Sequence, residues 1–215
     1  MIEGVIFDLD GVLVSTDEMH YQAWKRLAEE LGITDFGRAD NEKQRGVSRM
    51  ESLQIVLDKG SRAYSQEEKT ELAERKNDYY KESLKKLDAS AVLPGAEETA
   101  KMLRKRNIKT AVGSASKNAD TILERTGLKQ YMDKVSSGLD TTKSKPDPEV
   151  FLVAAEKLGL APEKCLVVED SAAGVQAAKA AGMKSLGVGP YHKTLGADYC
   201  AEHLASDIDW EEVLG

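Results

Sequence analysis

The chain has 215 residues, of which 41% are hydrophobic and 6% aromatic, and its formal net charge is −7. This length allows one or two packed domains, and the acidic balance argues against a nucleic-acid-binding surface. The two cysteines, Cys165 and Cys200, are too few for a disulfide framework and do not form a CxxC motif, so both are expected to be reduced thiols. The first apolar run, residues 5–7, resembles neither a membrane span nor a secretory signal. We therefore expect a soluble, cytoplasmic monomer that binds neither nucleic acid nor membranes.

Short, continuously apolar runs alternate with helical patterns along most of the chain. The runs predict strands at residues 5–7, 108–113, 134–136, 165–168 and 184–188, and the segments between them predict helices at 96–106, 116–126, 147–158 and 172–181. The third of these helices has a clear start, with Asp147 as a cap, Pro148 in the first position and Glu149 in the first turn. Continuously apolar strands are typical of a parallel sheet covered on both faces. The sequence thus predicts an α/β fold, a Rossmann-like doubly wound parallel sheet.

Residues 15–92 interrupt this alternation, because they contain several polar amphipathic helices and no strand-like run. Helices are expected at about 17–31, 48–59 and 65–87, and Ser48 with Glu51 forms a capping box at the start of the middle one. The chain returns at "VLPGA", where Pro94 and Gly95 mark a turn. This pattern predicts an all-helical cap domain at 15–92, joined by two connections that form a hinge to a core of residues 1–14 and 93–215.

Polar residues follow four of the predicted strands, at the edge where an open parallel sheet binds its ligand. Asp8 and Asp10 follow the first strand, Ser114 the second and Glu169-Asp170 the fourth, while Lys145 comes after the third. Each alone is equally consistent with a turn, a helix cap or a solvated side chain. Because they follow four different strands, together they predict one ligand-binding site at this edge of the sheet.

This set of side chains suits phosphoryl transfer assisted by Mg²⁺, which prefers oxygen ligands and usually takes one or two carboxylates. Asp8 and Asp170 are the natural ligands, with the Asp10 carbonyl and Glu169 close by. Lys145 and Ser114 would stabilise charge on the phosphoryl oxygens. Asp8 can also form an aspartyl phosphate, and Asp10 can then transfer a proton.

The stretches "DLDGV", "GSAS", "KPDP" and "VVEDSAAGV" resemble the four motifs of the haloacid dehalogenase superfamily, and the helical insert is similar to that superfamily's first type of cap. The dehalogenases themselves lack the second aspartate of the first motif, so Asp10 indicates phosphoryl chemistry. The resemblance implies Asp8 as nucleophile and Asp10 as general acid and base. It also implies Ser114 and Lys145 around the phosphoryl group, and Mg²⁺ held by Asp8, Asp10, Glu169 and Asp170.

The predicted cap carries a second set of polar residues. In "QRGVSRM", Arg49 and the backbone N–H groups of Gly46 and Val47 suit a clamp for a second phosphate. Thr16 and His20 share one helix face beside the hinge, where they would couple cap closure to the position of Asp10. These residues could equally be solvated side chains of a helical surface.

Together with "SASKN" at 114–118, this set resembles the β-phosphoglucomutase family within the superfamily. Arg45 stands where that family has lysine, a departure that bears on how His20 is paired. The resemblance implies substrate contacts by Asp10, Thr16, His20, Arg45, Gly46, Val47, Arg49, Ser52, Lys76, Ser114, Ala115, Ser116, Lys117 and Asn118.

The expected function is an isomerase that interconverts β-glucose 1-phosphate and glucose 6-phosphate through β-glucose 1,6-bisphosphate and a phosphorylated Asp8. Cap closure would exclude water from the phosphoenzyme. The main alternative is a sugar-phosphate or phosphoglycolate-type phosphatase, in which water attacks the same phosphoenzyme. Phosphonoacetaldehyde hydrolysis would require a cap lysine placed to form a Schiff base, and none is evident. A noncatalytic phosphosugar sensor would have no need to keep Asp8, Asp10 and Lys145 together.

Overall fold

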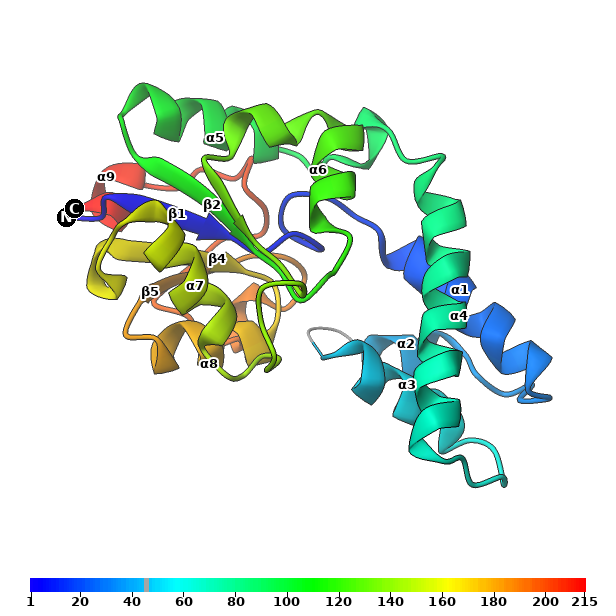
Figure 1. Ribbon diagram of the computed structural model, residues 1–215. Coiled ribbons are helices and arrows are strands. Elements are labelled where there is room, and N and C mark those ends of the chain that lie inside the picture. Colours follow the sequence, from blue (N-terminus) through cyan, green and yellow to red (C-terminus); the bar gives the residue numbers. More distant parts are fainter. Residues whose placement is uncertain (45–46) are drawn as a thin grey trace. The chain divides into compact units, whose positions relative to one another are not determined.

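The computed structural model describes residues 1–44 and 47–215, and these divide into two compact units (Figure 1). The core unit comprises Met1–Ser15 and Asp88–Gly215, and the helical unit comprises Thr16–Leu87. Ser15 and residues 88–92 therefore lie in the core unit and not, as predicted, in the inserted domain. The reason is local pairing, since the Ser15 N–H donates to the Ala91 carbonyl at 2.9 Å and Val14 forms an antiparallel bridge with Val92.

The core unit is built on a parallel sheet whose strand order is β3-β2-β1-β4-β5-β6. The strands are β1 (Gly4–Phe7), β2 (Lys109–Gly113), β3 (Lys134–Ser136), β4 (Cys165–Glu169), β5 (Lys184–Gly187) and β6 (Tyr199–Cys200). Every residue of β1 and β4 is buried, as their continuous apolar character predicts. The edge strand β6 was not predicted, because two residues are too few to show a periodic pattern. The predicted class, an α/β fold with a parallel sheet, is confirmed.

Helices cover both faces of this sheet. They are α5 (Ala96–Lys105), α6 (Ala119–Thr126), α7 (Glu149–Leu158), α8 (Ala172–Ala180) and α9 (Trp210–Leu214). Short 3-10 helices lie in the connecting segments at Ala89–Ala91, Leu128–Tyr131, Pro162–Lys164 and His192–Thr194. Figure 1 shows α5 and α6 on one side of the strands and α7 and α8 on the other. The sheet is thus doubly wound, and the carboxyl ends of its strands form one open edge.

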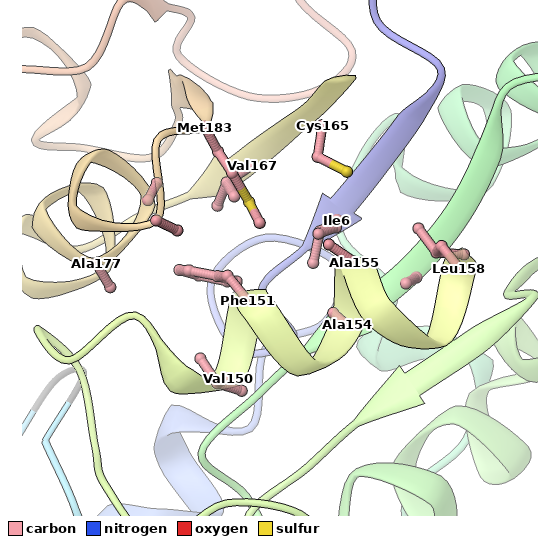
Figure 2. Packing of buried hydrophobic residues seen from close by; sticks show 13 residues of the cluster. Ile6, Val150, Phe151, Ala154, Ala155, Leu158, Cys165, Val167, Ala177 and Met183 are labelled. Atoms are coloured by element: carbon pink, nitrogen blue, oxygen red, sulfur yellow. The ribbon is translucent and has the colours of Figure 1, made fainter. Parts of the chain in front are cut away.

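Helix α7 fixes the loop before it through one apolar face. Val150, Phe151 and Ala154 pack with Ile6 of β1 and Val167 of β4 in a single buried cluster (Figure 2). Pro148 is the N-cap residue, one position earlier in the helix than predicted, so Asp147 precedes the cap. The Asp147 Oδ1 still accepts the Glu149 N–H at 3.0 Å. The preceding loop is therefore anchored where it delivers Lys145 to the sheet edge.

The helical unit contains α1 (Asp17–Glu30), α2 (Arg38–Glu42), α3 (Arg49–Leu57) and α4 (Gln66–Leu84). Its core is a separate cluster that includes Trp24, Leu27, Leu53, Val56 and Leu72. The predicted capping box is confirmed at the start of α3, where the Ser48 Oγ accepts the Glu51 N–H and the Glu51 carboxylate accepts the Ser48 N–H. Helix α2 was missed, because its five polar residues carry no apolar period.

Within residues 1–44 and 47–215, no helix combines the length and apolar character that crossing a membrane requires.

Candidate active site

The centre of the candidate site is a buried ion cluster at the carboxyl ends of β1 and β4. The Lys145 Nζ donates to the Asp8 Oδ1 and to the Glu169 Oε1, each at 2.5 Å. The Lys145 side chain is 3% exposed and that of Glu169 is 1% exposed. Strands β1 and β4 are paired in parallel, with Phe7 opposite Val168. The residues that follow these two, Asp8 and Glu169, therefore lie side by side at the carboxyl ends of the strands. Three predicted site residues are therefore brought into direct contact.

The Lys145 ammonium also lies 4.8 Å from the centroid of the Phe151 ring. The Phe151 ring packs against Gly113 at the end of β2. A Cβ on residue 113 would lie only 2.7 Å from the Phe151 Cδ1, so the ring fits there because glycine has no side chain. A cation over a ring face gains electrostatic stabilisation when it is removed from water. The Phe151 ring is thus a third neighbour of the Lys145 ammonium, besides Asp8 and Glu169.

Burial and charge shift the proton affinities of this cluster. Burial raises the pKa of Asp8 to about 7, and the negative charge of Glu169 acts in the same direction while Lys145 opposes it. Burial also disfavours the charged form of Lys145, but the carboxylates of Asp8 and Glu169 outweigh that effect and raise the pKa of Lys145 above its ordinary value. The lysine is therefore a permanent cation beside Asp8, as the stabilisation of phosphoryl oxygens requires.

Glu169 is held by both of its oxygens. While Oε1 accepts from Lys145, Oε2 accepts the backbone N–H of Ser171 at 2.8 Å and its hydroxyl at 2.9 Å. Gly174 leaves room for the carboxylate, because a Cβ there would lie 1.9 Å from the Glu169 Cδ. Glu169 thus contacts Lys145 and Ser171, and its role as a metal ligand stays a prediction.

Asp170 lies against the loop that follows β1. A Cβ at Gly11 would come within 2.0 Å of the Asp170 Oδ2, so the missing side chain leaves room for this carboxylate. The positive φ of Gly11 is a second reason for glycine at this position. Residues 10 and 14 form a bridge that closes the same loop, and the Gly11 N–H donates to the Val14 carbonyl at 2.8 Å. Asp170 is thereby placed next to the Asp10-Gly11 backbone.

The predicted Mg²⁺ ligands Asp8, Asp10, Glu169 and Asp170 lie at this edge of the sheet, and their role as ligands stays a prediction. Within the described residues no group of three or more His, Cys, Asp or Glu side chains is arranged to hold a metal ion. Mg²⁺ commonly uses only one or two carboxylates, with water and substrate phosphate completing its shell. Asp8, Asp170 and the carbonyl of Asp10 would supply such a set, and Asp8 and Glu169 both also accept from Lys145.

The loop after β2 contributes polar groups from Ser114 to Asn118. Ser114 is buried, and its Oγ accepts the Ser116 N–H at 3.1 Å, which leaves the hydroxyl hydrogen to donate elsewhere. The Ser116 Oγ in turn accepts the Asn118 N–H at 3.2 Å, just before α6. Ala115 and Lys117 lie against Gly138, where an added Cβ would be 2.3 Å from the Ala115 carbonyl oxygen. Strand β2 adjoins β1, so this loop leaves the sheet beside Asp8.

In the helical unit, predicted residues of α1 meet α4. The Thr16 Oγ1 and the Tyr80 hydroxyl are 3.0 Å apart, and the His20 ring stacks on that of Tyr80 with centroids 4.0 Å apart. The Lys76 Nζ lies 2.8 Å from the His20 Nδ1 and 4.6 Å from the Trp24 ring centroid. Burial, followed by the charges of Lys76 and Arg49, holds the pKa of His20 well below its ordinary value. His20 is therefore neutral, and its Nδ1 accepts a hydrogen bond from the lysine.

Arg49, the predicted phosphate clamp, is the first residue of α3 and contacts α4. Its Nη1 donates to the Glu74 Oε1 and its Nη2 to the Asn77 Oδ1, both at 2.9 Å. Ser52, one turn later, is buried, and its carbonyl accepts from the Gln44 side chain at 2.9 Å. Val47 is half-buried. Arg45 and Gly46, also predicted to contact substrate, lie outside the described residues.

The sequence reasoning overlooked four residues that hold predicted site residues in place. Ser171 supports Glu169, Tyr80 supports Thr16, and Glu74 with Asn77 supports Arg49. A local signal existed for Ser171, which opens α8 as its N-cap residue and accepts the Gly174 N–H. The spacing of Glu74 and Asn77 places both on one face of α4, but nothing in the sequence says that Arg49 faces them.

A buried carboxylate at the end of strand β1, in contact with a lysine and followed in space by the acidic residues after β4, is the arrangement expected of an aspartate-based phosphotransferase on a doubly wound sheet. Residues 2–182 match the sequence profile of the haloacid dehalogenase-like hydrolases, and the chain belongs to this family. The family resemblance predicted from the four motifs is confirmed.

Particular relatives narrow the class further. The chain is 41% identical to the β-phosphoglucomutase of Bacillus subtilis, over 98% of this chain and 93% of that protein. The crystal structure of β-phosphoglucomutase from Clostridium difficile matches with a TM-score of 0.91 and 38% identity, covering 99% of this chain and 96% of that one. A phosphorylated carbohydrates phosphatase of Thermotoga maritima is 33% identical, over 86% of this chain and 84% of that protein. The chain is thus a homologue of β-phosphoglucomutase, an isomerase of this superfamily.

Proposed function

We propose that this protein interconverts β-glucose 1-phosphate and glucose 6-phosphate through β-glucose 1,6-bisphosphate. The observation that carries the proposal is the placement of Asp8 at the end of β1 with Lys145 bound to it, in a chain whose homology to β-phosphoglucomutase is almost full length. A buried carboxylate next to a fixed cation can accept a phosphoryl group and return it, which divides the transfer into two steps.

In the first step, the phosphoryl group on Asp8 passes to the 6-hydroxyl of β-glucose 1-phosphate. The oxygen of that hydroxyl bonds to phosphorus, the bond from phosphorus to the Asp8 oxygen breaks, and Asp10 takes the hydroxyl proton. In the second step, Asp8 attacks the 1-phosphate of the bisphosphate, the bond from phosphorus to the sugar oxygen breaks, and Asp10 returns the proton to that oxygen. Glucose 6-phosphate leaves and Asp8 is phosphorylated again.

Several residues support these steps without exchanging bonds. Lys145 and the hydroxyl of Ser114 stabilise the oxygens of the moving phosphoryl group. Glu169 holds Lys145 through the contact described above. Arg49 of the helical unit binds the second phosphate. Ser116, Lys117 and Asn118 of the core unit bond sugar hydroxyls or that phosphate. Thr16, His20, Ser52 and Lys76 supply further contacts to the sugar phosphate, together with Arg45, Gly46 and Val47.

We place Mg²⁺ at Asp8, Asp170 and the Asp10 carbonyl, where a bound cation would offset negative charge on the phosphoryl oxygens. The positions of Gly11 and Asp170 support this placement, since they bring a carboxylate to the Asp10-Gly11 backbone.

A phosphatase acting on phosphorylated sugars is the second candidate, and it is favoured by the likeness to the Thermotoga maritima phosphatase. Both reactions use the same phosphoenzyme and differ in whether a sugar hydroxyl or water attacks it. One assay separates them. The protein is incubated with β-glucose 1-phosphate, MgCl₂ and a trace of β-glucose 1,6-bisphosphate, and glucose 6-phosphate and inorganic phosphate are followed in parallel.

We expect glucose 6-phosphate as the main product, with the Asp8→Asn variant inactive because its amide cannot be phosphorylated. Release of inorganic phosphate as the main product would reject the mutase and favour the phosphatase.

A further inference from the structure

The guanidinium of Arg49 is shared between two side chains of α4 that differ in kind. Asn77 is 5% exposed, and it contributes a neutral oxygen to Nη2 from within the helical unit. Glu74 contributes a carboxylate to Nη1, and its side chain is 56% exposed. The two lie three residues apart on one face of α4, while Arg49 begins α3. One partner is thus internal and uncharged, and the other is at the surface and anionic.

The geometry of this arrangement resembles that of an anion-binding arginine. A planar guanidinium binds carboxylate and phosphate oxygens through the same fork of N–H groups. The Arg49 side chain is 20% exposed, so a phosphate can approach it from the solvent side, where Glu74 lies. A phosphate and the Glu74 carboxylate compete for the same donors, and they repel each other if both remain close.

We propose that Glu74 is a positioning residue that occupies the phosphate position on Arg49 and sets the affinity of the clamp. This inference rests on the proposed function in one respect, which is that Arg49 binds the second phosphate of the substrate. Asn77 keeps the guanidinium oriented throughout. Glu74 gives up its contact when the phosphate binds, and its exposed carboxylate moves into solvent.

The exchange costs little because the displaced pair is partly exposed. Pairs of this kind contribute about 0.2–1 kcal/mol, which corresponds to a change of at most about fivefold in an equilibrium constant. Glu74 therefore lowers the affinity for the second phosphate severalfold. Weaker ground-state binding aids a mutase, whose bisphosphate must release each phosphate from the clamp before the other can bind there.

The test is a set of kinetic measurements on Glu74→Gln and Glu74→Ala. The first variant removes the charge and keeps an acceptor, and the second removes both. We expect a KM for β-glucose 1-phosphate that is lower in Glu74→Ala by up to about fivefold. The decrease should be smaller in Glu74→Gln, with kcat unchanged or reduced. Glu71→Gln is the matched control, because Glu71 is an exposed glutamate one turn earlier on the same helix and its loss changes the net charge equally.

A double-mutant cycle with Arg49→Ala shows whether Glu74 acts through the arginine. The effect of Glu74→Ala on KM should disappear when Arg49 is already alanine. An unchanged or higher KM in both Glu74 variants, or an equal decrease with and without Arg49, would overturn the inference. Failure of the proposed function is recognised separately, because the unmodified protein would then form no glucose 6-phosphate. In that case the same cycle, read from the calorimetric affinity for inorganic phosphate, still decides whether Glu74 competes for Arg49.

Discussion

Substituting alanine for Gly174 should destabilise the protein, although the same change in a solvent-exposed helix is stabilising. Gly174 lies in the first turn of α8, and replacing glycine by alanine within a helix ordinarily gains about 1 kcal/mol. Here the new Cβ would lie 1.9 Å from the Glu169 Cδ, so the carboxylate must move. The Glu169 and Lys145 side chains are 1% and 3% exposed, which leaves no solvent to replace the broken contact.

The size of the effect follows from these two opposed contributions. Breaking a buried ion pair costs about 3–5 kcal/mol, so the net loss in the free energy of unfolding should be about 2–4 kcal/mol after the gain in helix propensity. Catalysis should suffer as well, because Lys145 loses one of the two carboxylates that hold it. Removing a fixed donor to a transition-state oxyanion lowers kcat by about 10²–10³-fold, and we expect a decrease toward the lower end of that range.

Urea unfolding and the mutase assay check both parts. Gln176→Gly and Gln176→Ala provide the calibration, because Gln176 is exposed on the same helix and the two variants differ only in helix propensity. If Gly174→Ala were more stable than the unmodified protein by the amount that separates the Gln176 variants, and equally active, the support of Lys145 by Glu169 would be refuted.

Two further predictions concern a glycine and a histidine. Gly11→Ala should abolish most activity, because the new Cβ would meet the Asp170 carboxylate. Gly159→Ala is the control: it has the same positive φ but no atom within 4 Å, so it should cost only about 1–2 kcal/mol of stability. Activity and urea unfolding of both variants separate the backbone strain at a positive φ from the displacement of the Asp170 carboxylate. Equal activities of the two variants would contradict the role of Gly11. His20 has a pKa below 6.5 in the folded protein, so the unfolded chain binds its proton first and stability falls as the pH drops below about 6.5. This loss of stability at low pH should be absent from His20→Gln, as unfolding at pH 7 and pH 5.5 would show. Equal pH dependence in both proteins would argue against a neutral His20.

The sequence by itself determined the class of fold and the identity of most of the candidate site. Runs such as "CLVV" are readable because a strand buried on both faces must be apolar throughout. The capping box of Ser48 and Glu51 is readable because its hydrogen bonds span only three residues. Asp8 and Asp10 stand out because polar residues also follow the other predicted strands, although each alone is equally consistent with a turn or a helix cap. All of these signals are local.

Only the tertiary structure decided which of these groups touch. The contact between Lys145 and Asp8 joins residues 137 positions apart, and that between Arg49 and Asn77 joins residues 28 apart. Whether Glu169 meets Lys145 or a metal ion depends on the register of β4 against β1, on the Ser171 turn and on the space left by Gly174. Such contacts are set by the packing of whole elements, which a pattern in one segment does not encode. For that reason the residue types of the site were predictable, while the contacts of Glu169 with Lys145 and of Glu74 and Asn77 with Arg49 were not.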